Sequence, residues 1–253
     1  MKLTEESFWS DYWRAVRLPA EVNLGFSFDR CLAHHLSLHL KDCSGEIFEI
    51  GCAPGKWLSY FYKKHNLIPN GVEYSLAGVE ATLRNFKLLN IPSNTIVRGD
   101  FFKIKPDKKF DVVISLGFIE HFDNVDEVIR LHLEWIKPGG LLILGVPNFS
   151  GFNGLIQAVL DKEILDKHNL NIMNLDFFNQ LDSAHDVDKV FVDYIGSFEP
   201  ALAIPKHKFG NPLQFLVRCF LFAIRLLRKI RLFDKLNNRF FSSYILAIYR
   251  KKY

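Results

Sequence analysis

Cysteine is scarce in this sequence, and the few cysteines present do not pair by spacing. Four occur among the 253 residues, at Cys31, Cys43, Cys52 and Cys219, with no C-x-x-C motif and no clustered histidines beside them. This spacing argues against a structural zinc site and against a disulfide framework. It favours a protein of a reducing compartment.

No secretory leader is expected, and a long uninterrupted apolar run is also missing from the sequence. The N-terminal MKLTEESFWSDYW mixes charges with aromatic side chains, whereas a leader needs an apolar core there. The most apolar segment, 213–233, has fifteen apolar residues, but five cations interrupt it. No run therefore reaches the roughly 18 residues of a membrane-spanning helix, and the protein is expected to be cytoplasmic.

The net charge is small but unevenly distributed. The 32 Lys or Arg and 28 Asp or Glu residues give +4 overall. Residues 211–253 hold ten of the cations and a single acid, Asp234, which gives +9 there and −5 for the first 210 residues. A partner that recognises positive charge is therefore expected to meet the C-terminal segment.

The sequence does contain enough apolar residues for the core of a single globular domain, with 49% hydrophobic and 24% charged residues. β-rich apolar runs alternate with segments of helical periodicity, which predicts parallel β-α-β units with right-handed crossovers. The fold class predicted is α/β, a doubly wound Rossmann-like sheet. The predicted strands are 47–51, 70–75, 94–100, 110–116, 141–148, 190–196 and 242–251. The predicted helices are 28–40, 56–65, 76–89 and 125–136, the last ended by Lys137-Pro138-Gly139-Gly140 as a glycine C-cap.

The helical pattern at 213–233 is basic and amphipathic. At about 100° per residue, Arg218, Arg225 and Lys229 fall on one narrow stripe and leave a wide apolar face. This pattern is typical of a helix that lies on an anionic membrane surface, here the inner face of the membrane. It is equally typical of a core helix packed on the sheet, so both interpretations stay open.

The turn after the first predicted strand, in EIFEIGCAPGKWLSYF, bears on the ligand, because ligands of parallel sheets bind at the carboxyl ends of the strands. A triphosphate loop needs Ser or Thr after its lysine, but Trp57 occupies that position. A dinucleotide loop needs a second glycine where Ala53 stands, and Pro54 lacks the N–H that would bind a phosphate. The turn therefore favours a ligand without phosphates.

Three acids end successive predicted strands. Glu49 precedes the first turn, and Glu73 ends the second strand, where a carboxylate can accept hydrogen bonds from two ribose hydroxyls. Asp100 ends the third strand and is followed by Phe101 and Phe102, which offers an acceptor for an exocyclic amine beside aromatic surface for a purine. Together the acids indicate a nucleoside with a small polar tail.

The sequence resembles the class I S-adenosylmethionine-dependent methyltransferases in five motifs, EIGCAPG, GVEYS, RGDFF, FDVVISLGFIEHF and IKPGGLLILGVPN. The branch that it resembles includes ubiquinone-type O-methyltransferases and the methyltransferases of cell-surface polysaccharide clusters. The resemblance covers 46–148 well and the remainder loosely. It implies a seven-stranded sheet whose last strand, 242–251, is antiparallel, an N-terminal helical lid, a helical insert, and S-adenosylmethionine as the cofactor.

The resemblance also implies the residues that bind the cofactor. The methionine part would be lined by Glu49, Gly51, Cys52, Ala53 and Gly55. Glu73 would hold the ribose beside Tyr74 and Ser75, Asp100 and Phe101 would hold the adenine, and Leu116, Gly117 and His121 would close the site.

One methyltransferase domain over 1–253 is expected, in four segments. Residues 1–45 would form the lid and a helix, with Tyr12 and Trp13 as lid aromatics, and 46–148 the cofactor-binding core. Residues 149–210 would form an acceptor-pocket insert, and 211–253 the basic amphipathic helix and last strand. No motif in the lid or the insert identifies the acceptor.

His121 is the candidate catalytic base, because an imidazole with a pKa of about 6.5 can take a proton near neutral pH. The alternative is a histidine that only packs on the cofactor, with Glu120 orienting it. His168 and His185 lie in the insert and can contact an acceptor. His185, Asp186 and Asp188 are more typical of a solvated turn than of a metal site, so no metal is predicted.

The predicted function is O-methylation of a small-molecule, sugar or lipid-linked glycan acceptor. One alternative is an RNA ribose methyltransferase, because the A-P-G turn is similar to that of the ribosomal-RNA enzymes. Their Lys-Asp-Lys-Glu tetrad has no counterpart here, since Asp111 begins a strand rather than ending one, so a nucleic-acid partner is not favoured. The second alternative is a protein of this fold that binds a partner without catalysis.

Overall fold

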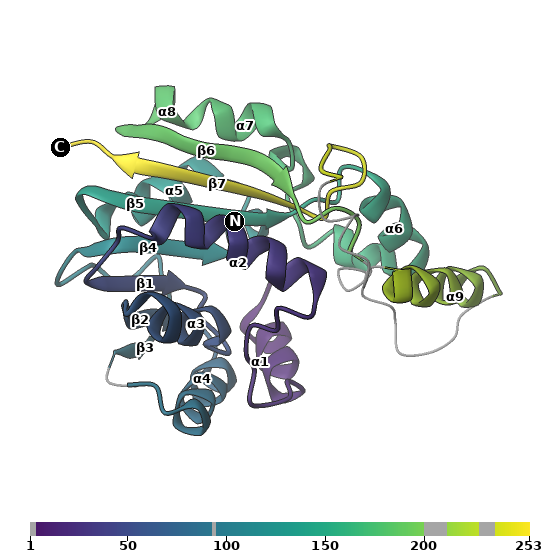
Figure 1. Cartoon of the computed structure of the whole chain (residues 1–253), viewed down its shortest axis with the longest axis horizontal. Coiled ribbons are helices and arrows are strands. Elements are labelled where there is room, and N and C mark those ends of the chain that lie inside the picture. Colours follow the sequence, from purple (N-terminus) through teal and green to yellow (C-terminus); the bar gives the residue numbers. More distant parts are fainter. Residues whose placement is uncertain (1–3, 93–94, 200–211, 228–235) are drawn as a thin grey trace.

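The computed structural model describes residues 4–92, 95–199, 212–227 and 236–253. Within these ranges a seven-stranded sheet has helices on both faces, with the strand order β3-β2-β1-β4-β5-β7-β6 (Figure 1). The strands are β1 Glu46–Ile50, β2 Ile68–Glu73, β3 Ile96–Arg98, β4 Phe110–Leu116, β5 Ile136–Pro147, β6 Val187–Ile195 and β7 Tyr244–Lys251.

The strand pairing confirms the predicted fold class. The pairs β1–β2, β2–β3, β1–β4 and β4–β5 are parallel, and β7 runs antiparallel to both β5 and β6. The strand order reverses between β1 and β4, and ligands of open α/β sheets bind at such a switch point, outside the carboxyl ends of the strands.

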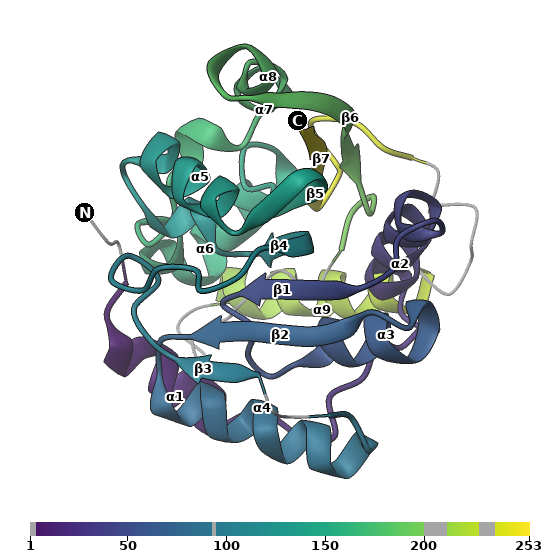
Figure 2. The same cartoon turned by 90° about the vertical axis from the view of Figure 1, so that its left-hand side faces the viewer.

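The helices of the described residues are α1 Glu6–Arg14, α2 Ser27–Leu40, α3 Lys56–His65, α4 Leu76–Leu89, α5 Val125–Glu134, α6 Phe152–Leu165, α7 Leu175–Asn179, α8 Leu181–Ala184 and α9 Pro212–Leu227. Figure 2 shows α2 and α3 over one face of the sheet and α5 over the other. Alternate residues of β1 supply the two faces, because successive side chains of a strand point to opposite sides. Ile47 packs with Leu36 and Phe61, whereas Phe48 stacks on Trp135 with ring centroids 4.3 Å apart.

One predicted helix end is wrong. The Lys137-Pro138-Gly139-Gly140 segment lies inside β5, since α5 ends at Glu134 and β5 begins at Ile136. The β4–β5 ladder shifts its register in this part, and Gly139 has a φ of +76°. A glycine with positive φ at an irregular step of a ladder is typical of a β-bulge, which sequence periodicity does not distinguish from a helix cap.

Helix α9 packs on α6 rather than on the sheet. Val217, Leu221 and Ile224 of α9 contact a small cluster that contains Ile156 and Leu160 of α6. In Figure 1 the α6–α9 pair lies to one side of the sheet. The remainder of the helix predicted at 213–233 lies outside the described residues. Within the described ranges, no helix is long and apolar enough to cross a membrane.

Candidate functional site

A cavity of about 310 Å³ lies at the switch point of the sheet. Its walls come from the segments that follow β1, β2, β3 and β4, from α1, and from the segment at the end of α6. Nine predicted site residues line it, namely Gly51, Ala53, Glu73, Tyr74, Asp100, Phe101, Leu116, Gly117 and His121. The tertiary structure thus brings together residues from four separate motifs.

The turn after β1 keeps its backbone close to the cavity. Gly51 has a φ of +72°, and a Cβ there would lie 3.0 Å from the ring of Phe118. The N–H groups of Gly51 and Cys52 both donate to the carbonyl of Val72 on β2, over 2.9 and 3.2 Å. Glycine is needed at residue 51 because a side chain would meet Phe118 and would disfavour the positive φ. A ligand can therefore approach the main chain of this turn.

The other four predicted residues, all within the described ranges, are not among those that line the cavity: Glu49, Cys52, Gly55 and Ser75. Cys52 is buried, and a Cβ at Gly71 would lie 2.9 Å from its sulfur. Gly55 is the N-cap residue of α3, and a Cβ there would lie 2.5 Å from the ring of Phe86 on α4. Both residues are closely packed against their neighbours, and direct contact of either with a cofactor stays a prediction.

Ser75 positions Glu73 in the wall. The backbone N–H and the hydroxyl of Ser75 donate to Oε1 of Glu73 over 2.8 and 2.9 Å, while its Oγ accepts from the N–H of Gly78 and caps α4. Burial raises the pKa of Glu73, and the hydrogen bonds from Ser75 oppose that shift. The carboxylate is therefore held in one orientation at the end of β2.

Glu49 is a second buried carboxyl, one residue before the end of β1. It is 5% exposed, and its Oε2 has no hydrogen-bond partner among the described residues. Burial, and next the neighbouring Glu73, raise the pKa of Glu49 well above its usual range. An unpaired buried carboxyl oxygen is costly, so a hydrogen-bond donor reaching this place would stabilise the folded protein.

Asp100 and Phe101 lie together in the cavity wall beyond β3. Asp100 Oδ1 accepts from the backbone N–H of Phe102 over 3.2 Å, which closes the turn after the strand. The Phe101 ring is buried, edge-on to Phe118 with ring centroids 5.8 Å apart. The acid and the aromatic surface predicted for adenine are thus adjacent, and their role in binding stays a prediction.

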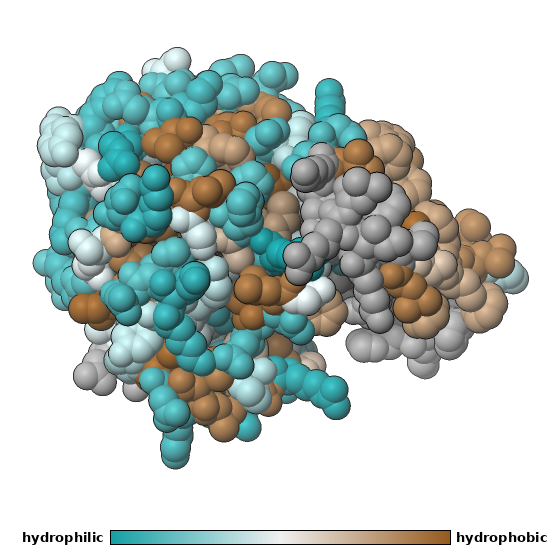
Figure 3. Space-filling model, in the orientation of Figure 1, coloured by the Kyte–Doolittle hydropathy of each residue, from teal (hydrophilic) through white to brown (hydrophobic). Residues whose placement is uncertain are grey.

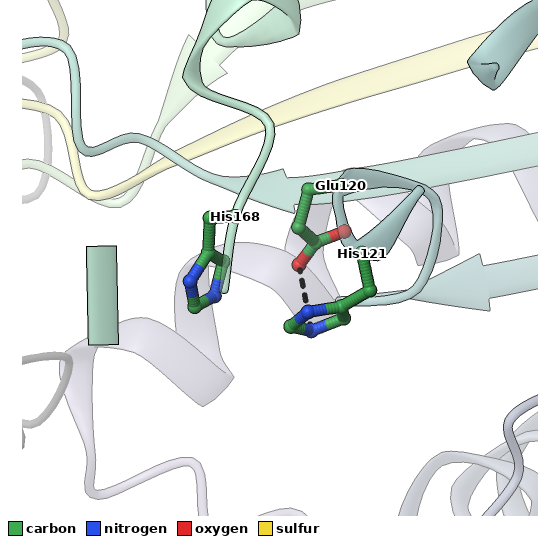
Figure 4. A group of neighbouring side chains, drawn as sticks. All are labelled: Glu120, His121 and His168. Atoms are coloured by element: carbon green, nitrogen blue, oxygen red, sulfur yellow. Dashed lines mark ion pairs between the residues drawn. The ribbon is translucent and has the colours of Figure 1, made fainter. Parts of the chain in front are cut away.

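A polar cluster of Glu120, His121 and His168 forms another part of the wall (Figure 4). Nδ1 of His121 donates to the carbonyl of Lys167 over 2.8 Å, and Nδ1 of His168 donates to the carbonyl of Ile164 over 2.6 Å. Because carbonyls only accept, both neutral rings carry the proton on Nδ1 and an unprotonated Nε2. Nε2 of His121 lies 3.9 Å from Oε1 of Glu120.

Burial removes the charge from this cluster. It lowers the pKa of His121 to about 3, with a further contribution from His168, and it raises the pKa of Glu120 to about 8. Burial also lowers the pKa of His168. The expectation that His121 titrates near neutral pH is therefore wrong for this environment, because a charged imidazole would lose its hydration here.

Helix α1 covers the cavity beside this cluster. The ring of Trp9 lies edge-on to His121 at 5.1 Å, and Nε1 of Trp9 donates to Oγ1 of Thr4 over 3.0 Å. Nζ of Lys167 lies 4.3 Å from the centre of the Phe8 ring, a cation–π contact. Tyr12 and Trp13, the aromatics expected in a lid, also line the cavity.

Several cavity residues have no assigned role in the sequence. Phe8, Trp9, Lys167 and Tyr244 line the cavity. The aromatic FWSDYW segment could have indicated Phe8 and Trp9. No local motif in the sequence indicates Tyr244 of β7 or Lys167, which follows α6. Of the two insert histidines, His168 lines the cavity. Nε2 of His185 instead lies 3.0 Å from Oδ1 of Asp126.

Comparison with known proteins identifies the family. The chain matches the methyltransferase-domain family over residues 28–191. It is 30% identical to a ubiquinone biosynthesis O-methyltransferase of Rickettsia bellii over 117 residues, which are 44% of this chain and 45% of that protein. It is 24% identical to a probable (S)-tetrahydroprotoberberine N-methyltransferase of Papaver bracteatum over 114 residues, 45% of this chain and 32% of that protein. The chain thus spans less than half the length of these curated relatives.

Solved structures agree with the fold. A methyltransferase from Thiobacillus denitrificans in complex with S-adenosyl-L-homocysteine has a TM-score of 0.59 at 15% identity, covering 100% of both chains. A methyltransferase from Archaeoglobus fulgidus has a TM-score of 0.56 at 18% identity, covering 98% of this chain and 100% of that one. Together with the family match over 28–191, these likenesses show that the chain belongs to the methyltransferase-domain family and has the fold of the class I S-adenosylmethionine-dependent methyltransferases.

Proposed function

We propose that the protein transfers the methyl group of S-adenosylmethionine to an oxygen of an acceptor bound beneath α1. The acceptor class is a small molecule, a sugar or a lipid-linked glycan. The observation that carries the proposal is one cavity whose wall contains both the strand-end acids Glu73 and Asp100 and the polar cluster around His121. The ubiquinone O-methyltransferases among the relatives support oxygen as the methyl acceptor.

The residues present fit this cofactor. Glu73, oriented by Ser75, would accept from the ribose hydroxyls, and Asp100 with Phe101 would contact the adenine. Gly51 has a positive φ and no side chain to cover the turn after β1, so it would lie under the methionine part. The cofactor supplies a methyl group on a cationic sulfur, so the leaving group is neutral. The main task of the protein is then to hold the acceptor oxygen in line with that methyl group.

An acceptor hydroxyl must also lose its proton. His121 presents an unprotonated Nε2, because its Nδ1–H is held by the carbonyl of Lys167. Its lowered pKa makes it a weak base, which suits an acidic hydroxyl such as a phenol better than an alkyl alcohol. We infer that His121 accepts a hydrogen bond from the acceptor.

Calorimetric titration with S-adenosylmethionine and its demethylated product tests the proposal directly. We expect one binding site per chain. Transfer of labelled methyl groups to a panel of phenols and sugar hydroxyls then tests the acceptor class, and His121→Ala should lower turnover without abolishing cofactor binding. Absence of binding of both nucleosides would contradict the proposal, and unchanged turnover of His121→Ala would remove the role of His121.

A second proposal concerns peripheral contact of α9 with an anionic membrane, for which the observation is the exposed apolar face of that helix. Leu216 and Phe222 are 63% and 64% exposed, and apolar surface gathers over α9 in Figure 3. In the sequence, residues 211–239, which include α9, carry seven cations and one acid, a net charge of +6 that would attract anionic lipid. A helix that presents its apolar face in this way can bury that face in the headgroup region.

Flotation with liposomes tests the contact. The chain should float with vesicles that contain anionic lipid and much less with neutral ones. The double variant Leu216→Ser, Phe222→Ser should lose flotation. Leu88→Ser, which changes a 56% exposed leucine of α4, is the matched control and should float as the parent does. Failure to float with either lipid would overturn the proposal.

A further inference from the structure

The polar cluster brings three potential metal ligands together. Glu120 and His121 lie in the short 3-10 turn after β4, and His168 follows α6, far along the chain. One ligand atom of each residue can be chosen so that all three lie within 4.8 Å of one another. Figure 4 shows the three side chains converging from these two segments.

The two imidazoles are already oriented as metal ligands usually are. Each donates its Nδ1–H to a main-chain carbonyl, His121 to Lys167 and His168 to Ile164, so each Nε2 keeps its lone pair. Histidines that bind metals generally donate their other ring N–H to a carbonyl or carboxylate, which fixes the tautomer and the ring orientation. The carbonyl groups that would hold both imidazole ligands in place are thus already present.

The cluster contains a buried polar atom that has no hydrogen-bond partner within the described ranges. Oε2 of Glu120 is buried and has no hydrogen-bond partner among the described residues, and the residue is 1% exposed. The ammonium group of Lys167, the nearest cation along the chain, lies over the Phe8 ring. A buried polar atom without a partner is unfavourable. A divalent cation between the three side chains would displace the carboxyl proton of Glu120 and bind all three at once.

We propose that Glu120, His121 and His168 bind one divalent transition-metal ion, such as Zn²⁺, Fe²⁺ or Co²⁺, in the wall of the cavity. Two imidazole nitrogens and one carboxylate suit these ions and leave coordination positions open. Mg²⁺ and Ca²⁺ prefer oxygen ligands alone, so they should bind more weakly. The sequence predicted no metal because His168 belongs to a segment that has no ligand spacing with His121.

The consequence for catalysis rests on the proposed function. All three residues line the cavity that would hold the acceptor. A divalent ion there would bind an acceptor oxygen and lower the pKa of its hydroxyl. Because Nε2 of His121 would then bind the metal, the ion would take over the role proposed for that lone pair. Metal binding itself can be measured without cofactor or acceptor, so the two proposals fail independently.

The test is a titration of the full chain after treatment with a chelator. Added Co²⁺ should produce the visible absorption of the protein-bound ion at one equivalent per chain, Zn²⁺ should displace it, and Mg²⁺ should not. Glu120→Gln and His168→Ala should each weaken Co²⁺ binding by about 100-fold or more, since even outer-shell changes cost 10- to 100-fold. His34→Ala, which changes an exposed histidine of α2, should bind as the parent does.

Folding is checked for each variant by its circular-dichroism melting curve and its affinity for S-adenosyl-L-homocysteine. Three results would overturn the inference: no Co²⁺ or Zn²⁺ bound at one equivalent, binding unchanged in both folded ligand variants, or a preference for Mg²⁺. If a primary amine competes with the cluster while no metal is retained, the acceptors serve an ammonium group instead, and the inference is wrong.

Discussion

The strand-end wall of the cavity, residues 50–102, and the lid wall, formed by α1, 118–122 and 164–168, are built in different ways. The strand-end wall is one continuous stretch in which neighbouring turns hold each other, as Ser75 holds Glu73. The lid wall joins three segments that are distant along the chain, through contacts such as Trp9 with His121. The first wall should therefore depend on local backbone geometry, and the second on a few side-chain contacts.

The largest effect is expected from the backbone of the strand-end wall. Gly55 lies within this stretch and Gly117, which follows β4, lies outside it and serves as the comparison; their φ values are +78° and +73°. A Cβ at Gly55 would lie 2.5 Å from Phe86, whereas at Gly117 the nearest atom is 3.6 Å away. Both alanine substitutions should cost about 1 kcal/mol for the positive φ. Gly55→Ala should cost about 1–3 kcal/mol more through overpacking. Urea unfolding measures the free energy of unfolding of both variants. Equal losses in Gly55→Ala and Gly117→Ala would show that Phe86 moves aside.

The next effect is a pH dependence behind the strand-end wall. His132 is buried between Val128 and Ser115, and burial lowers its pKa to about 4. Since the unfolded histidine has a pKa of about 6.5, protons bind preferentially to the unfolded chain as the pH falls from 6.5 to 4, and stability is lost in that window. Over this pH range, the free energy of unfolding of His132→Gln should fall by up to about 3 kcal/mol less than that of the parent protein. Urea unfolding at each pH measures this loss, with His34→Gln as the control, and equal acid sensitivity of parent and His132→Gln would contradict the buried assignment.

A third prediction concerns the ribose contact proposed for Glu73. Glu73→Gln removes a charged acceptor that Ser75 holds in the wall. Hydrogen bonds to charged groups contribute about 1.5–3 kcal/mol, so the affinity for S-adenosyl-L-homocysteine should fall by about 10- to 100-fold. Calorimetry measures it. Glu80→Gln, on the exposed side of α4, is the matched control, and an unchanged affinity of the Glu73 variant would remove Glu73 from the site.

The smallest effect on stability is expected from the lid wall. None of the residues of α1, all of which the structure describes, is fully buried. Trp9→Ala should therefore change the free energy of unfolding by less than about 1 kcal/mol, while methyl transfer to an acceptor falls because His121 loses its neighbour. Urea unfolding measures the effect on stability, and a transfer assay measures the effect on methyl transfer. Phe26→Ala, which changes an exposed residue between α1 and α2, is the control. A loss of several kcal/mol would mean that α1 belongs to the core.

Much of the strand-end wall was predictable from the sequence because its signals are local. Alternating strands and helices, a glycine-rich turn after β1, and the acids Glu73 and Asp100 at strand ends are each visible within a few residues. The wrong helix end and the open interpretation of 213–233 both arose where local patterns are ambiguous. The Lys137-Pro138-Gly139-Gly140 segment fits a helix cap and a bulged strand equally. The pattern of 213–233 fits both an interfacial helix and a helix on the sheet, and in the structure α9 packs on α6.

The lid wall could not be predicted to the same extent, for a physical reason. The pKa of His121 depends on burial and on His168, and both follow from how the segment after α6 folds back on the turn after β4. The residues next to His121 in the sequence do not indicate that it is buried or that it lies near His168. The proximity of Glu120 to the two histidines is likewise a property of the packing.

The sequence by itself determined the alternation of strands and helices in parallel β-α-β units and the turn chemistry that places the strand-end acids, because hydrophobic period and backbone constraints act over short distances. Only the tertiary structure decided which side chains meet across the cavity, which of them lose their charge, and where α1 and α9 lie. Those properties depend on desolvation and on contacts between distant segments, which exist only once the chain has folded.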